Sequence, residues 1–157
     1  MLVNADFHLH SCFSAASSKD MVIRNMAPKA KLKGLGLLGT GDALHPGWLD
    51  IIEETTSYSG DGIYTFDDMD FILTTEVEGK NRIHHVIIIP DMDIARELSD
   101  KLPSNNKCVD GRPKTNYGGV ELLELAHDHD CLIGPAHAFT PWTGMNKSFD
   151  SIYNRRS

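Results

Sequence analysis

The sequence has no long apolar run. Its longest uninterrupted stretch of apolar residues covers only residues 86–89, far short of the roughly 20 residues that span a membrane as a helix. The N-terminus also lacks the basic segment followed by an apolar core that marks a secretion signal. From these absences we expect neither a membrane span nor a leader of that type. We therefore expect a soluble, cytoplasmic protein with no membrane partner.

Cysteine is scarce. The chain contains Cys12, Cys108 and Cys131, an odd number with no C-x-x-C pair. This pattern argues against a disulfide framework and against a zinc knuckle built from cysteines. We expect reduced thiols, and we expect Cys12 to serve in packing although it lies near possible metal ligands.

Basic residues are fewer than acidic ones, 15 against 22, and the formal net charge is -7. This balance argues against the chain binding a nucleic-acid backbone by itself, although bound divalent cations would change the sign of the local charge. The chain has 157 residues, of which 41% are hydrophobic. That size suits one domain with a real core.

Short apolar runs alternate with segments of helical periodicity. We expect strands near residues 2–7, 35–38, 71–76, 82–89 and 131–133, and helices over 25–33, 46–55, 91–101 and 120–127. Residues 57–62 and 103–118 have the composition of loops. This alternation predicts an α/β fold with a largely parallel sheet or barrel, whose active site would lie at the C-terminal ends of the strands.

Side chains of metal-ligand type follow these strands. In the motif DFHLH (residues 6–10), residues two apart share one face of an extended chain, so His8 and His10 can bind one cation. Further ligand types occur at or just after the later predicted strands, and they are Asp42, His45, Glu76, His85 and His137. The pattern predicts a single metal site.

Two choices between neighbours remain open in the sequence. Adjacent strand residues point to opposite faces, so only one of His84 and His85 can reach the site, and we favour His85. Glu76 and Glu78 share a face, and we assign a bridging carboxylate to Glu76 with Glu78 as the alternative.

Other candidate residues have plainer explanations. The motif HDHD (residues 127–130) is rich in ligand types, but it lies at a helix end where charged residues are usually solvated. Phe139 and Trp142 offer a stacking platform for a nucleobase, and core packing is an equally good explanation for both.

Several of these motifs resemble a known family. DFHLHS (6–11) with GTGD (39–42), Glu76 and His137 resembles the PHP (polymerase and histidinol phosphatase) phosphoesterases, whose fold is a distorted, TIM-like βα barrel of about seven strands. More narrowly, SSKDM (17–21), GTGDALHP (39–46) and PAHAFTPW (135–142) resemble endonuclease Q.

The resemblance implies an activity and a set of roles. Endonuclease Q enzymes cleave DNA on the 5′ side of deaminated bases or abasic sites with divalent metal. By resemblance, two or three Zn or Mn ions are expected. Glu76, Asp42 and His137 would act in catalysis. The expected metal ligands are His8, His10, Asp42, His45, Glu76, His85 and His137, and the substrate-binding residues would be Phe139 and Trp142.

The chain departs from the family at its C-terminal end. PHP proteins close their site with a late Asp-x-His pair, and endonuclease Q continues into a cysteine-rich zinc module, but no histidine follows His137 here. We therefore expect residues 1–157 to form one PHP-type domain that is incomplete at its C-terminal end and has little or no activity. The alternatives are a non-catalytic metal-binding remnant and an amidohydrolase-like metal hydrolase, whose barrel also opens with H-x-H.

Overall fold

The computed structural model describes residues 2–106 and 108–148. Seven strands form one sheet, and four α-helices and two 3-10 helices accompany them. The strands are β1 (Ala5–Asp6), β2 (Leu37–Gly39), β3 (Ser57–Gly60), β4 (Ile63–Phe66), β5 (Met69–Glu78), β6 (His84–Ile89) and β7 (Leu132–Pro135). The helices are α1 (Ile23–Leu32), α2 (Pro46–Thr55), α3 (Met92–Lys101) and α4 (Gly119–His127), with 3-10 turns at Lys80–Arg82 and Met145–Ser148.

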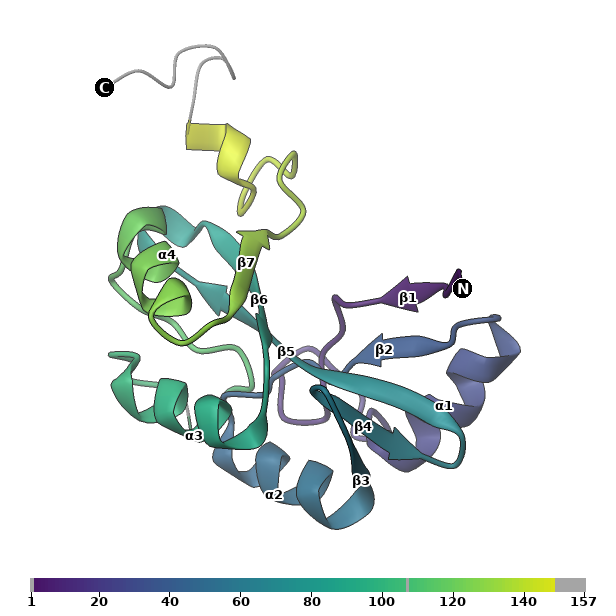
Figure 1. Ribbon diagram of the computed structural model, residues 1–157. Coiled ribbons are helices and arrows are strands. Elements are labelled where there is room, and N and C mark those ends of the chain that lie inside the picture. The colour runs from purple at the N-terminus through teal and green to yellow at the C-terminus, as the bar shows by residue number, and fades with distance from the viewer. Residues whose placement is uncertain (1, 107, 149–157) are drawn as a thin grey trace.

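The sheet curls around the long strand β5. β1, β2 and β5 run parallel, whereas β6 is antiparallel to both β5 and β7. The α-helices lie along the outer side of the curled sheet, and β1, β3 and β7 are its edge strands, each paired with a single neighbour (Figure 1). The expected α/β class is confirmed, and the sheet is a curled half-barrel.

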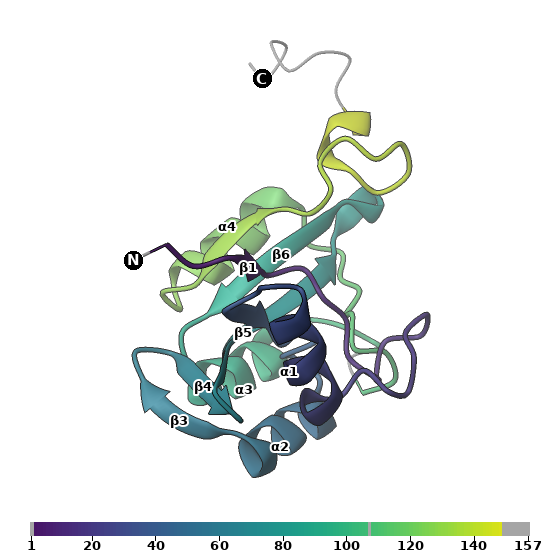
Figure 2. The same ribbon diagram turned by 90° about the vertical axis from the view of Figure 1, so that its right-hand side faces the viewer.

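Two expectations for the sheet were wrong in detail. Residues 57–62, expected to form a loop, supply β3 and the two-residue turn of an antiparallel hairpin with β4. The hairpin lies beside α2 (Figure 2). Within the expected strand 82–89, residues 84–89 form β6, which is antiparallel because only the tight connection through Lys80–Arg82 separates it from β5. The sheet is therefore mixed rather than largely parallel.

Strand β5 separates the core from the site. Its odd-numbered residues, among them Phe71, Leu73 and Val77, are buried with the apolar side chains of the helices. Its even-numbered residues point to the inner face of the curl, where Glu76 lies near the end of the strand. The period of two along one strand thus places an apolar core and a carboxylate on opposite sides.

The three cysteines are unpaired, and Cys12 packs against the core, as expected. In the described part of the chain, no helix is both long enough and apolar enough to cross a membrane. The last nine residues of the expected domain, 149–157, lie outside the described residues.

Candidate metal centre

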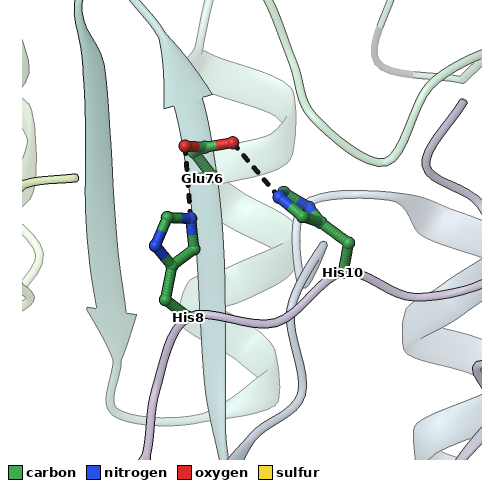
Figure 3. A group of neighbouring side chains, drawn as sticks. All are labelled: His8, His10 and Glu76. Carbon is green, nitrogen blue, oxygen red and sulfur yellow. Dashed lines mark ion pairs between the residues drawn. The ribbon is translucent and has the colours of Figure 1, made fainter. Parts of the chain in front are cut away.

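The buried carboxylate of Glu76 is the centre of the site. Its Oε1 lies 3.2 Å from Nε2 of His8, 2.9 Å from Nδ1 of His84 and 2.9 Å from Nε2 of His137. Its Oε2 lies 3.3 Å from Nε2 of His10. Figure 3 shows His8 and His10 reaching the two oxygens from the chain that follows β1. Four imidazoles therefore converge on one carboxylate.

Strand direction explains this convergence. The parallel strands β1, β5 and β7 end at the same edge of the sheet, so the chain after each of them reaches one place. β6 runs the other way, and its first residue, His84, therefore lies at the same edge. The two ends of β6 are not equivalent, and only its beginning faces the site.

The atoms around Glu76 fit divalent cations. The ligand atoms of His8, His10 and Glu76 form one group within 4.8 Å of one another, and those of Glu76, His84 and His137 form a second. Glu76 is the one residue that belongs to both groups. Imidazole nitrogens with a carboxylate are ligands that suit transition metals.

Burial and hydrogen bonding oppose each other at Glu76. Desolvation is the largest influence and would raise the pKa of the carboxyl, but the hydrogen bonds from His10, His8 and His84 together outweigh it. The pKa of Glu76 is therefore held below its usual range. The carboxylate stays ionised in a buried position that requires positive charge beside it.

Asp42 lies behind His10 and holds its ring. Its Oδ2 accepts hydrogen bonds from the backbone N–H and the hydroxyl of Ser11, both at 2.7 Å, and its Oδ1 accepts one from the hydroxyl of Ser14 at 3.0 Å. The same Oδ1 lies 3.2 Å from Nδ1 of His10. This carboxylate–histidine pairing orients Nε2 toward Glu76. The structure thus gives Asp42 a supporting position.

Glycine allows the chains after β1 and β2 to approach closely. Gly41 has a positive φ of 63°, and a Cβ there would lie 2.3 Å from the carbonyl oxygen of Leu9. Its N–H donates to the hydroxyl of Thr74, and its carbonyl accepts from the indole of Trp48 at 2.8 Å. These contacts hold Asp42 next to His10.

The structure places His84, and not the favoured His85, beside Glu76. In the antiparallel register of β5 and β6, His84 lies opposite Glu78 and Val86 opposite Glu76, so these residues share a face. His85 lies opposite Val77 on the core side, where burial, and secondarily His84, lowers the pKa of His85. Periodicity alone cannot choose between neighbours without the register.

His45 is also outside the cluster. It precedes α2 as its N-cap residue, and its ring packs against Phe13 with the ring centres 4.2 Å apart. Burial lowers the pKa of His45. Neither group of ligand atoms in the described residues includes His45, because the turn after Asp42 carries its side chain away from Glu76.

The segment after β7 orients His137. His137 Nδ1 lies 3.1 Å from the hydroxyl of Thr140 and 3.3 Å from that of Thr143, which leaves Nε2 for Glu76. Phe139 and Trp142 in the same segment are exposed, at 85% and 74%, so neither is a core residue. The segment extends beyond the sheet in both views (Figures 1 and 2).

Two features differ from what the sequence indicated. In the HDHD motif, His129 is buried rather than solvated, with Nδ1 2.7 Å from the carbonyl oxygen of Leu125 and Nε2 3.1 Å from Nζ of Lys101, away from Glu76. Arg112, in a segment interpreted only as a loop, places Nη1 3.4 Å from Oε2 of Glu76. Its neighbours in sequence, Gly111 and Pro113, indicate a turn but not a position in the site.

The pKa of His10 predicts how metal affinity depends on pH. Hydrogen bonds with Asp42 and then Glu76 raise the pKa of His10 from 6.5 to about 9. Without metal, this shift stabilises the fold fully below about pH 6.5, and the contribution is lost as pH rises through about 9. A cation binds neutral imidazole and must displace the proton. Mn²⁺ affinity should therefore rise up to about tenfold per pH unit between about pH 7 and about pH 8.

Calorimetric titration in buffers of different ionisation enthalpy tests this dependence and counts the protons released. His10→Asn should make Mn²⁺ affinity depend less steeply on pH. His127→Asn, at an exposed histidine outside the cluster, should leave the pH dependence unchanged. A wild-type affinity that is constant over this range would contradict the assignment of His10.

Comparison with known proteins supports the family resemblance. No protein-family model matches the chain. An uncharacterized protein of Methanocaldococcus jannaschii is 43% identical over 145 residues, which make up 91% of this chain and 17% of that protein. The structure of PsfC from Pseudomonas syringae covers 92% of this chain and 59% of its own at a TM-score of 0.63 and 17% identity, which shows a shared fold.

The similarity to two endonuclease Q structures is much stronger. PfuEndoQ, a lesion-specific endonuclease from Pyrococcus furiosus, matches 100% of this chain with a TM-score of 0.93 and 43% identity. An endonuclease Q in complex with a 27-mer duplex that has an abasic lesion at the active site matches with a TM-score of 0.92 and 43% identity. The chain covers 40% and 41% of these two proteins. The resemblance to endonuclease Q that the sequence motifs indicated is thus confirmed. This chain is similar over its whole length to part of endonuclease Q.

Proposed function

We propose that this chain is the metal-ligating part of a PHP-type metallophosphoesterase that cleaves DNA as endonuclease Q does. The observation that carries the proposal is the convergence of four histidines on the buried carboxylate of Glu76. The similarity to PfuEndoQ, a lesion-specific endonuclease, supports the reaction class. The half-barrel would be part of a distorted, TIM-like PHP barrel, with residues 1–157 as one domain that the rest of a longer protein completes.

The site would hold two or three divalent cations, Zn or Mn by the nature of its ligands. His8 and His10 would bind one with Glu76, and His84 and His137 would bind a second with the same carboxylate. Such cations lower the pKa of water and neutralise charge that develops on phosphate oxygens. Asp42 would keep the His10 ring fixed during the reaction.

The DNA substrate is proposed from the relative. An endonuclease Q was solved with a duplex carrying an abasic lesion at its active site, and we infer cleavage on the 5′ side of deaminated bases or abasic sites for the complete protein. Exposed Phe139 and Trp142, close in sequence to His137, would offer aromatic faces to a base. The cytoplasmic location expected from the sequence stays a prediction.

Loaded with Mn²⁺ or Zn²⁺, the chain is expected to hydrolyse bis(p-nitrophenyl) phosphate slowly without nicking a uracil-containing or abasic duplex at the lesion. A longer protein that also supplies the late Asp-x-His pair should nick the duplex. Each missing group that stabilises transition-state charge is worth about a hundredfold or more in rate. The net charge of -7 also opposes binding of a polyanionic DNA backbone by this chain alone.

The measurement compares gel-resolved nicking and p-nitrophenol release for both proteins with matched Glu76→Gln variants. Lesion-specific nicking by the 157-residue chain at the rate of the longer protein would refute incompleteness. Metal binding without turnover of any phosphodiester by either protein would favour the non-catalytic metal-binding alternative.

A further inference from the structure

Arg112 brings a permanent positive charge to the edge of the metal centre. Its Nη1 lies 3.4 Å from Oε2 of Glu76, which is long for a hydrogen bond between charged groups. Its Nε is buried and has no hydrogen-bond partner among the residues that the structure describes. The guanidinium therefore has donor capacity that the protein leaves unused. We propose that Arg112 binds a non-bridging oxygen of the substrate phosphate, an assignment that rests on the proposed function.

The backbone around Arg112 is held in place. The N–H of Gly111 donates to the carbonyl of Phe13 at 3.1 Å, and the carbonyl of Pro113 accepts from the N–H of Glu78 at 3.0 Å. The loop is thus bonded on one side of Arg112 to the chain after β1 and on the other to the end of β5. Little conformational entropy remains to be lost at this position when a ligand binds.

Gly111 fixes where the loop crosses the site. A Cβ at this residue would lie 2.4 Å from both Cγ and Oδ2 of the Asp42 carboxylate, so only glycine permits this approach. The loop therefore passes directly over Asp42, and Arg112 follows it toward Glu76. The two candidate metal groups share Glu76, so the guanidinium lies beside the carboxylate that is common to both.

Charge indicates what kind of ligand this position suits. A guanidinium beside bound cations is repelled by them unless an anion lies between. Lys114, two residues further along the loop, adds a second positive charge 3.7 Å from Glu78. The planar fork of arginine matches phosphate oxygens, and the Arg112 side chain keeps 27% of its surface exposed at the site. A phosphate held jointly by the cations and Arg112 satisfies all of these groups.

The test measures binding of inorganic phosphate to the Mn²⁺-loaded chain by equilibrium dialysis, with Mn²⁺ affinity measured separately. Arg112→Gln should weaken phosphate binding about tenfold to a hundredfold, the range for a hydrogen bond to a charged group. Mn²⁺ affinity should stay the same or rise, because a competing positive charge has been removed. Arg112→Lys should lose part of the affinity, and the control Arg24→Gln, at an exposed arginine of α1, should lose none.

These outcomes separate the two proposals. A wild-type chain that binds no Mn²⁺ would refute the metal centre and the role of Arg112 together. Mn²⁺ binding with no phosphate binding, or with equal phosphate binding by wild type and Arg112→Gln, would refute only the role of Arg112. Loss of both Mn²⁺ and phosphate in a folded Arg112→Gln would mean that Arg112 supports Glu76 instead. If Arg112→Gln does not fold, Arg112→Lys decides, and unchanged phosphate affinity in that variant would overturn the assignment.

Discussion

Glu76→Gln is expected to reduce the affinity for Mn²⁺ or Zn²⁺ by at least about a hundredfold, since it removes the one side chain common to both ligand groups. The amide keeps the shape of the side chain but loses the negative charge that cations require. Four imidazoles would then face a neutral group, and bound cations would repel each other without a bridging anion. Calorimetry and metal analysis of dialysed protein measure the effect.

Glu78→Gln is the matched control. Glu78 lies two residues further along the same face of β5, with its Oε2 3.4 Å from Nε2 of His84 and 3.7 Å from Nζ of Lys114. It belongs to neither ligand group in the described residues, and its replacement should change metal affinity by a much smaller factor. Similar losses in the two variants would show that the bridging position has been assigned to the wrong carboxylate.

Trp48→Ala is expected to lower the free energy of unfolding by about 3–5 kcal/mol, the usual cost of truncating a fully buried aromatic side chain. Trp48 has no exposed surface and packs in the core near Phe13. Its indole N–H also donates to the carbonyl of Gly41, the residue before Asp42. The substitution therefore leaves a cavity and an unpaired buried carbonyl at the back of the metal centre.

Trp48→Phe separates the two contributions. It keeps most of the apolar volume but cannot donate to Gly41, and the loss should be about 1–3 kcal/mol. Urea unfolding followed by far-UV circular dichroism gives both values. A loss below about 1 kcal/mol for Trp48→Ala would contradict the packing around this residue.

Most of the metal centre follows from local patterns in the sequence. His8, His10, Glu76 and His137 each lie at or just after a short apolar run, and strands that run parallel must bring such positions to one edge. Helices such as α1 and α2 were predictable because their apolar residues recur at helical spacing. The β3–β4 hairpin was missed because residues 57–62 are polar and glycine-containing, and they pair only with β4, at the outer edge of the sheet.

The positions of His85, His45 and Arg112 could not be predicted in the same way. Two neighbours in a strand have equivalent local sequence, and only the direction and register of β6 against β5 place His84 on the face of Glu76. Arg112 lies 36 residues from Glu76 in the chain, and no periodic signal connects them. Its placement depends on contacts with Phe13, Asp42 and Glu78 that exist only in the folded chain.

The sequence by itself determined the α/β class, the apolar core of β5, and the kinds of ligand available to a metal. These properties depend on periods of two and 3.6 residues and on residue chemistry, which are local. Only the tertiary structure decided that β6 is antiparallel, that His84 rather than His85 reaches Glu76, that Asp42 supports His10, and that Arg112 enters the site. Strand direction, register and loop contacts involve residues far apart in the chain. They are set by the free energy of the whole fold, which no local sequence pattern contains.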